Sequence, residues 1–478
     1  MFSIISFSRI LFILILVTLS GCAAMRSYDN ELTQTIDLVG KGQLDLAINQ
    51  HDKSKSNDPD LLFYLEKGEL LRLKKQYKDS TNNWLLANNK VNEWENEAKI
   101  RLSNIFENAG AVMVNDKTLR YDGHNYEKVM LSSQLALNYL LDGNWALART
   151  EIKKTHEREA VIAEITEKEA SEIANKSSEK GINTTFKDLN GYPIETLNSP
   201  DVMALKNGYQ NAFSHYLAGF IYEALNEPGL AAPGYRQAIE LQPGIKLLED
   251  SLANLDTRNS TRKPSETDVL FIIESGVAPS LSSVTIPLPL LVSNLGIVPI
   301  SFPVLHTDTI HNNHPHEITI NNKEKLPLAQ ITSIENLSKR ALRDDMPGII
   351  FRGMLRATAK AMSQKALRDQ GSNAATIAGL VLNVANIITE SADERTWRTL
   401  PATINIGRVT LPSGNHEFSI GNDKKILNIQ GSHAVIVARL ISNQIFWSQP
   451  IYSQQMPIYG ASTPQPLPFV VGTDKQRM

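Results

Sequence analysis

The chain has 478 residues, and its 48 Lys and Arg against 51 Asp and Glu give a formal net charge of −3 at pH 7. A length of this order predicts two or three domains, because a domain usually takes roughly 100–200 residues. The nearly balanced charge provides no broad basic surface, which argues against a nucleic-acid partner. Cys22 is the only cysteine, so no disulfide can form within the chain.

The first residues have the features of a secretory signal. Arg9 precedes a short apolar run from Ile10 to Leu19, which is shorter than the roughly 20 residues that a membrane-spanning helix needs. The following Leu-Ser-Gly-Cys, which ends at Cys22, looks like a bacterial lipobox. We therefore expect residues 1–21 to be removed, and Cys22 to carry the acyl chains that anchor the protein. Ala23, in place of an aspartate, favours the outer membrane with the protein facing the periplasm.

Residues 22–257 show helical spacing of apolar side chains and few strand signals. The clearest unit resembles the 34-residue tetratricopeptide repeat (TPR), in which small residues let two antiparallel helices approach and aromatic residues fill the next gap. Its matching positions are Gly219, Tyr222, Ala231, Tyr235, Ala238 and Pro243. Less complete units contain Gly68, Leu71, Ser80, Trp84 and Ala87, and then Ala136, Tyr139, Ala148 and Ile152. A degenerate pair around Leu38, Gly42 and Ala47 opens the predicted array.

Stacked repeats leave a concave groove that typically holds a peptide or a partner helix. The predicted partner is therefore an envelope protein or peptide in this groove, with helices packed without a ligand as the alternative. Tyr121, Tyr126 and Glu127 lie between two helices beside a turn glycine, and we take them as candidate protein-binding residues. Residues 156–180 are densely charged and predict an extended, solvated helix.

A polar linker at 258–265 leads into a β-rich domain at 266–453, and the tail at 454–478 is rich in Pro and Gln. Short β-type runs predict an antiparallel sandwich. The predicted strands are 268–274, 284–289, 297–305, 403–411, 416–420, 425–430, 433–441 and 445–452. The fold class is thus α+β: a TPR-like helical array, then an antiparallel β domain.

A helical hairpin at about 347–390 interrupts these strands. Its first helix is amphipathic, with Arg352, Arg356 and Lys360 forming a basic stripe. Its second helix, 374–388, has no charge and is apolar nearly all round, so it must be covered by the sheet, by another subunit or by lipid. The same chain stretch contains Asp344 and Asp345, which we interpret as a charge patch near Pro347.

One segment carries a family resemblance. Residues 392–401, with Trp397 and Arg398 at their centre, and the segment 126–140 are similar to stretches shared by a poorly characterised family of proteobacterial lipoproteins. The resemblance covers most of the mature chain. It implies a TPR-like half joined to a distinctive C-terminal half, in a lipoprotein without known activity. Trp397 and Arg398 are interpreted as structural, because such side chains commonly tie a loop to a sheet.

No catalytic motif is present, so we expect a protein that is not an enzyme and has no cofactor. A histidine-rich stretch holds His306, His311 and His314, whose imidazoles are ligands that Zn²⁺ accepts. Asn312, Asn313 and Pro315 favour a solvated loop there, with a metal site as the weaker alternative.

These observations favour a lipoprotein that scaffolds or regulates an envelope assembly through its repeats. The alternative is a structural subunit of an oligomeric envelope complex that uses the apolar helix 374–388. A metal-dependent or other enzyme is the third hypothesis. The oligomeric state does not follow from the sequence.

Overall fold

A computed structural model of the chain describes residues 28–101, 120–186, 189, 191–289, 297–369 and 391–453. Three predicted features lie outside these residues: the signal peptide with Cys22, the apolar helix 374–388, and the tail 454–478. All three stay predictions.

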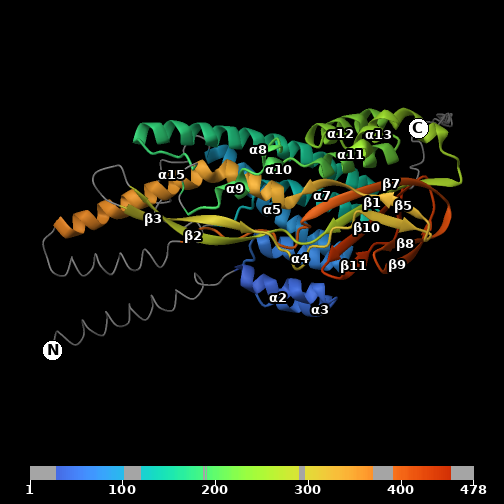
Figure 1. Ribbon diagram of the computed structural model, residues 1–478, viewed down its shortest axis with the longest axis horizontal. Helices are drawn as coiled ribbons and strands as arrows, with labels where there is room; N and C mark the ends of the chain where they lie inside the picture. Colours follow the sequence, from blue (N-terminus) through green and yellow to red (C-terminus); the bar gives the residue numbers. More distant parts are fainter. Residues whose placement is uncertain are drawn as a thin grey trace, which may run out of the picture.

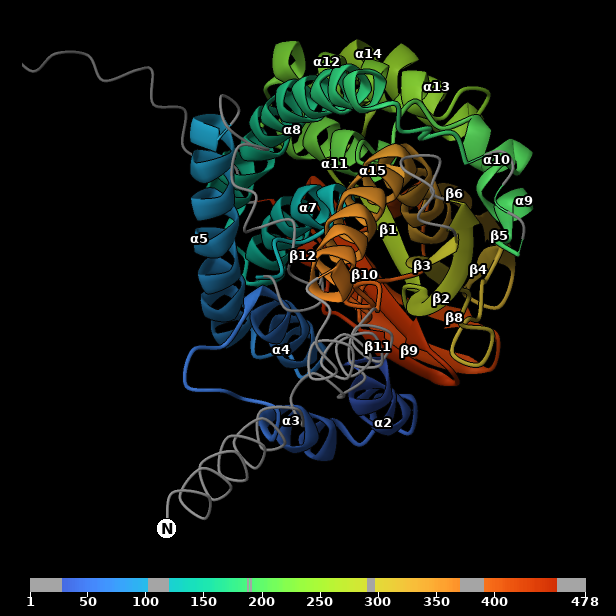
Figure 2. The same cartoon turned by 90° about the vertical axis from the view of Figure 1, so that its left-hand side faces the viewer.

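The N-terminal half is helical, as predicted, and its helices form an arc around the strands (Figure 2). The helices described are α2 (Tyr28–Gly40), α3 (Leu44–Asp52), α4 (Leu61–Leu73), α5 (Tyr77–Arg101), α7 (Asn125–Leu141), α8 (Trp145–Lys180), α9 (Ile194–Leu197), α10 (Pro200–Met203), α11 (Ala212–Ala224), α12 (Pro228–Leu241), α13 (Lys246–Ala253) and α14 (Leu255–Thr261). The predicted linker 258–265 therefore begins inside α14. The charged stretch 156–180 continues α8 as one helix, and it buries Arg158 and Ile162 on one side.

Three helix pairs repeat the same packing, which confirms TPR-like repeats. The pairs are α4 with α5, α7 with α8, and α11 with α12. In each pair a small residue on the first helix and a large residue on the second are separated by the same spacing: Gly68 and Trp84, Ala136 and Ile152, Gly219 and Tyr235. The Trp84 and Tyr235 side chains are fully buried, and they occupy the space that a Cβ would need at Gly68 and Gly219.

The C-terminal half contains three sheets within the described residues. Their strands are β1 (Glu266–Ser275), β2 (Ser280–Pro289), β3 (Ile297–His306), β4 (Glu317–Ile320), β5 (Glu324–Pro327), β6 (Ala329–Ser333), β7 (Thr403–Pro412), β8 (Gly414–Ile420), β9 (Asp423–Ile429), β10 (His433–Ile441), β11 (Gln444–Trp447) and β12 (Ile451–Tyr452). The largest sheet has the order β11-β10-β1-β7-β6, with β12 also paired to β10. A second sheet has the order β5-β4-β8-β9, and β2 and β3 form a separate two-stranded ribbon.

The largest sheet lies between the helices and the second sheet, so the molecule has three layers (Figure 1). Successive side chains of a strand point to opposite faces. On β1, Leu270 and Ile272 pack against the helical repeats, whereas Phe271 and Ile273 pack against the second sheet. Apolar cores on both faces of β1 join the two halves of the chain into one body.

Strand pairing is mostly antiparallel, as predicted, with one exception. β1 pairs with β10 in parallel, from Asp268 opposite His433 to Ser275 opposite Leu440. The prediction also missed β4, β5 and β6, which are short strands carrying many polar residues.

The first helix of the predicted hairpin is α15 (Ile334–Asp369), and it begins well before the predicted residue 347. Pro347 lies inside it, although a Pro-Gly pair usually signals a break. The ribbon of β2 and β3 packs along α15 through Ile286, Ile300 and Phe302. At Gly353 the two elements approach closely, because a Cβ there would lie 2.7 Å from the side chain of Ile300.

Replacing Gly219 by Leu should overpack the third repeat. A Cβ at Gly219 would lie 2.6 Å from the Cδ1 atom of Tyr235, and a Cβ at Gly234 would lie 2.8 Å from the backbone nitrogen of Gly219. Gly219 thus faces Tyr235 and Gly234 of α12. We expect Gly219→Leu to lower the free energy of unfolding by at least about 1–3 kcal/mol in a denaturant titration. Gly229 on α12 has open space beside it, so Gly229→Leu is the control and should melt like the parent. Equal stability of the two variants would contradict this packing.

Candidate functional site

The concave side of the repeats is occupied by the chain itself. Glu66 on α4 is fully buried and accepts hydrogen bonds from the backbone N–H groups of Arg398, at 2.7 Å, and Thr399, at 3.0 Å. The hydroxyl of Tyr28 also donates to it, at 3.0 Å. Burial raises the pKa of Glu66 to about 7, although these donors act in the opposite direction. Segment 395–400 is therefore bound in the manner expected of a foreign peptide.

Glu127 on α7 binds the same segment, which corrects the prediction of a partner-contact site. Its carboxylate accepts from the N–H of Trp397 at 2.7 Å, and from the hydroxyl of Tyr121 at 2.5 Å. Tyr121, Tyr126 and Glu127 are 5%, 2% and 1% exposed, respectively. Tyr121 and Glu127 are thus bound to the chain's own segment and are unavailable to a partner, whereas Tyr126 lines the cavity described below. Trp397 and Arg398 are also buried, which confirms their structural interpretation.

Two buried ion clusters extend this internal contact across the sheet. Arg72 on α4 bonds to Glu69 at 2.7 Å and to Glu274 on β1 at 2.5 Å. In the second cluster, Arg408 on β7 bonds to Asp268 on β1 at 2.5 Å and to Glu223 on α11 at 2.9 Å. Charges are seldom buried unless they are paired, so the groove side of these helices is complementary to the chain's own sheet. The predicted groove is thus not open to a partner in this structure.

The second cluster includes a group with the spacing of a metal site, formed by Glu223, Asp268 and His433. Its carboxylates are already paired, because Arg258 lies 2.5 Å from Glu223 and Arg408 bonds to both acids. A divalent ion at this point would face two guanidinium groups. Burial also lowers the pKa of His433 to about 4. We interpret the group as an ion-pair cluster that joins α11 to the sheet.

The three candidate metal-ligating histidines do not converge. His306 contacts the hydroxyl of Ser282 at 2.6 Å, and Nδ1 of His314 contacts the hydroxyl of Thr403 at 2.9 Å. His311 lies between two carboxylates, Asp308 at 2.9 Å and Asp37 at 3.2 Å. Hydrogen bonding to Asp308 raises its pKa. Each imidazole thus has its own partners, and the geometry does not support the metal-site alternative.

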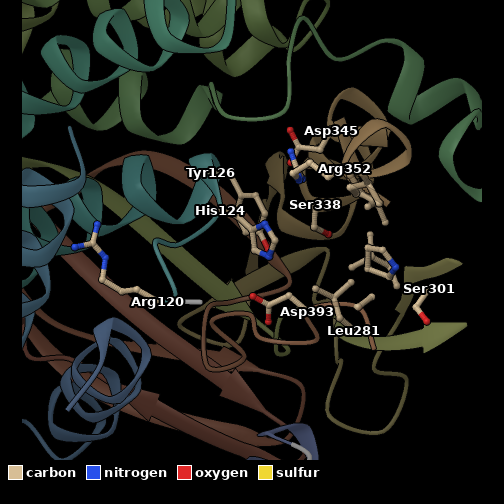
Figure 3. A pocket seen from close by; sticks show the side chains of 14 residues that line it. Arg120, His124, Tyr126, Leu281, Ser301, Ser338, Asp345, Arg352 and Asp393 are labelled. Atoms are coloured by element: carbon tan, nitrogen blue, oxygen red, sulfur yellow. The ribbon is translucent and has the colours of Figure 1, made fainter. Parts of the chain in front are cut away.

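The best-formed candidate site is a cavity of about 320 Å³ between α7, α15 and the ribbon of β2 and β3 (Figure 3). The range of volumes for ligand pockets begins at about 300 Å³. Its apolar wall consists of Tyr126, Leu281, Pro303, Leu305, Leu342, Ile349 and Ala392. Its polar groups are Arg120, His124, Ser301, Ser338, Asp345, Arg352 and Asp393. We call it the α15 cavity.

One stripe of α15 forms a side of this cavity. Ser338, Leu342, Asp345, Ile349 and Arg352 recur every three or four residues, a spacing that places side chains on the same face of a helix. The facing wall comes from β2 and β3, and the N-terminal end of α7 completes it. His124 begins α7 and stacks on Tyr126, with ring centroids 5.6 Å apart.

Two of the charged lining groups already have partners. Arg120 lies 2.7 Å from Asp122 and 2.9 Å from Glu97, while Asp393 lies 2.6 Å from Arg395. These pairs stabilise the rim of the cavity. By contrast, neither Asp345 nor Arg352 has a hydrogen-bonding partner among the described residues.

Asp345 is exposed at the cavity. The neighbouring protein still raises the pKa of its carboxyl group by desolvation, against the attraction of His124 and Arg352. Asp345 and Arg352 lie two helical turns apart, or about 10 Å along the axis. The arrangement can therefore bind a cationic group and an anionic group at two ends of an apolar wall.

The sequence analysis predicted part of the α15 cavity. The amphipathic first helix and the Asp344-Asp345 pair were recognised, although Arg356 of the predicted basic stripe is buried at 6% exposure. Asp344 and Asp345 are exposed, as expected of a charge patch, and Asp345 also lines the cavity. Nothing in the spacing along the chain indicated that the β2–β3 ribbon and residues 120–126 would meet it.

Comparison with known proteins adds little to this geometry. No model of a known family matches the chain, and no curated protein sequence matches it. Among solved structures, the chain is similar to a tetratricopeptide repeat protein from Parabacteroides merdae ATCC 43184, with 14% identity over 48% of this chain and 99% of that one. The TM-score is 0.13, so the repeat assignment rests on the helix packing described above. The resemblance to proteobacterial lipoproteins stays a prediction.

Proposed function

We propose that this protein is an acyl-anchored scaffold or regulator of a cell-envelope assembly, and that its partner binds at the α15 cavity. The observation that carries the proposal is an apolar wall with Asp345 and Arg352 beside it, two charged groups that make no hydrogen bond to the described residues. In this proposal the repeats have a structural role, because their concave side packs against the sheet and segment 395–400. The partner binds at the α15 cavity, outside this concave side.

The cavity chemistry favours a short segment of a partner protein. A volume of about 320 Å³ accepts one or two apolar side chains, and the stripe on α15 is long enough to lie along several residues of an extended peptide. Charge complementarity calls for a basic group near Asp345 and an acidic group near Arg352. Electrostatic matching of this kind mainly fixes which partner binds and in which direction.

The anchor is part of the proposal. The lipobox-like segment before Cys22 supports acylation, and Ala23 supports location at the outer membrane on the periplasmic side. Among the described residues, no helix has the length and apolar character required to span a bilayer. A protein with several acyl chains on its first residue would be held stably, since two lipid signals usually suffice.

Replacing Cys22 by Ala should stop lipidation and release or mislocalise the protein. The thiol is the only group in the chain that can take the diacylglycerol, so the variant is expected to be lost from the outer-membrane fraction after cell lysis and ultracentrifugation. Cys22→Ser provides a second variant without the thiol and should behave alike. Full retention of both variants in the outer-membrane fraction would contradict anchoring at Cys22.

Reversing one charge in the cavity should abolish partner capture. With a photo-crosslinking amino acid at Ile349, intact cells should yield a specific crosslinked product, whereas the same group at Ile426, which is 67% exposed on β9, should not. Asp345→Lys should then reduce the Ile349 product at least about tenfold, because like charges at an interface are strongly disfavoured. Circular dichroism should show an unchanged melt, since Asp345 has no hydrogen bond to lose among the described residues. An undiminished product in Asp345→Lys would refute binding at this cavity.

The two alternative hypotheses gain no support from the fold. The structural-subunit hypothesis rests on residues 374–388, which lie outside the described part of the chain. Enzymatic activity stays an untested hypothesis.

A further inference from the structure

A second cavity, also of about 320 Å³, lies at the other side of the start of α15. It is enclosed by α10, the first turn of α11, the end of α12 and strand β6. Asn336 and Leu337 of α15 face it, whereas Ser338 and Leu342 face the α15 cavity. The two cavities are therefore distinct, and we call this one the amide cavity.

Carboxamide side chains dominate its polar lining. Asn211 is only 4% exposed, and its Oδ1 atom accepts from the N–H of Ser214 at 2.9 Å, which caps the start of α11. Its Nδ2 group has no hydrogen-bond acceptor in the described structure. The Nδ2 atom itself has almost no accessible surface, so it lies within the wall and offers no donor to a molecule in the cavity.

Three further carboxamides at the cavity are uncommitted. The side chains of Gln242, Gln330 and Asn336 have no hydrogen-bonding partner among the described residues, although all three line the cavity. Gln210 differs, because it accepts from Asn207 at 2.7 Å and donates to Glu159 at 3.0 Å. The amides that face the cavity without a protein partner thus come from the end of α12, from β6, where Gln330 is exposed, and from α15, and they meet only in the folded chain.

The remaining lining restricts the class of ligand. Lys206 is paired with Glu240 at 2.5 Å, and Asp201 is exposed at the rim, so the interior offers little net charge. The walls between the amides are apolar: Leu205, Ala212, Leu241, Ile331 and Leu337. A suitable ligand is neutral, carries several groups that each donate and accept hydrogen bonds, and has apolar C–H surfaces between them.

We propose that the amide cavity binds a sugar ring. The hydroxyl groups of a sugar both donate and accept, as carboxamides do, and its C–H faces match the leucine and isoleucine walls. A peptide added to the edge strand β6 is less suitable, because β6 is short and its register shifts between Gln330 and Thr332. Irregularities of this kind disrupt regular strand pairing.

The test uses saturation-transfer NMR on the purified full chain, with glucose and N-acetylglucosamine as free probes and trialanine as the peptide probe. We expect saturation of the sugar C–H protons and none of trialanine. Asn336→Leu and Gln330→Leu should each reduce the sugar signal at least about fivefold. Asn415→Leu, which replaces an exposed amide on β8, should leave the signal unchanged, and so should Asp345→Lys in the α15 cavity.

Three outcomes would overturn the proposal. No transfer to either sugar at about 50 mM would mean that the cavity holds only water. Transfer to trialanine in place of the sugars would assign it to a peptide. A sugar signal that persists in both leucine variants, with unchanged circular dichroism melts, would place sugar binding elsewhere.

Discussion

Replacing Arg408 by Met is expected to lower the free energy of unfolding by about 3–5 kcal/mol, because the change leaves buried carboxylates without their cation. Arg408 bonds to Asp268 at 2.5 Å and to Glu223 at 2.9 Å, and both acids are fully buried. Glu223 keeps Arg258, but among the described residues the one ion-pair partner left within 4.0 Å of Asp268 is His433. Urea titrations of the parent and the variant would measure the difference.

The loss of stability in Arg408→Met should depend on pH. The arginine holds the pKa of Asp268 below its usual value, although burial alone would raise it. The pair therefore stabilises the fold above the ordinary aspartate pKa, and that contribution is lost as the pH falls through the depressed value. In Arg408→Met, the effect of burial on Asp268 is opposed less, so the pKa of Asp268 rises and the carboxylate is easier to protonate. The difference in the free energy of unfolding between parent and variant should therefore begin to narrow above the ordinary aspartate pKa of about 4, and it should keep narrowing as the pH falls toward the depressed pKa of the parent.

Two further variants separate this mechanism from a general packing loss. The double variant Asp268→Asn with Arg408→Met removes both charges, so it should be more stable than Arg408→Met alone. Lys246→Met breaks an exposed pair with Asp250 and should leave stability unchanged. If the double variant were no more stable than the single one, an unpaired buried acid would not explain the loss.

The repeats were predictable because their signal is local. Small and large residues at a fixed spacing on adjacent helices define the packing of each pair, as Gly68 with Trp84 and Gly219 with Tyr235 show. The parallel pairing of β1 with β10 was missed, yet both strands are buried along nearly their whole length. Continuous apolar runs typify strands covered on both faces, which was the available signal.

The sequence did not predict that the sheet and segment 395–400 occupy the repeat groove, because the charged residues that pair across this contact are far apart in the chain. Glu66 and Arg72 look like the polar groove side chains of an open repeat, and their partners lie more than 200 residues away. The one local sign was the presence of Asp268, Glu274, Arg408 and Arg439 within otherwise apolar strands. A buried charge requires a buried partner, so these residues indicated that a charged surface would pack on the sheet.

The α15 cavity needed tertiary structure for a similar reason. Its walls come from a turn before α7, a β-ribbon and a helix whose start was obscured by Pro347. Sequence spacing determines which residues share the α15 stripe, but not which ribbon covers it. The sequence therefore showed Asp345 as a surface charge, which it is, but not that it borders a cavity.

Trp397→Ala should cost about 3–5 kcal/mol in the free energy of unfolding, the usual range for a buried large aromatic residue. Trp397 is fully buried, its ring lies edge-on to Trp84 with centroids 6.0 Å apart, and its Nε1–H donates to Thr399 at 3.1 Å. Thermal melts and urea titrations of the variant would measure the loss, and Trp397→Phe should lose less.

A double-mutant cycle distinguishes a specific contact from loss of volume. Trp397→Ala and Trp84→Ala should be coupled by about 0.5–3 kcal/mol, because their side chains touch. Trp447 lies in the separate core between the two sheets, so its change to Ala should be additive with Trp397→Ala. A coupling energy between Trp397 and Trp84, with none between Trp397 and Trp447, would establish that segment 395–400 stays bound in the repeat groove. A cost below about 1 kcal/mol would instead mean that the segment leaves the groove readily, and a partner protein would then compete with it for the carboxylates of Glu66 and Glu127.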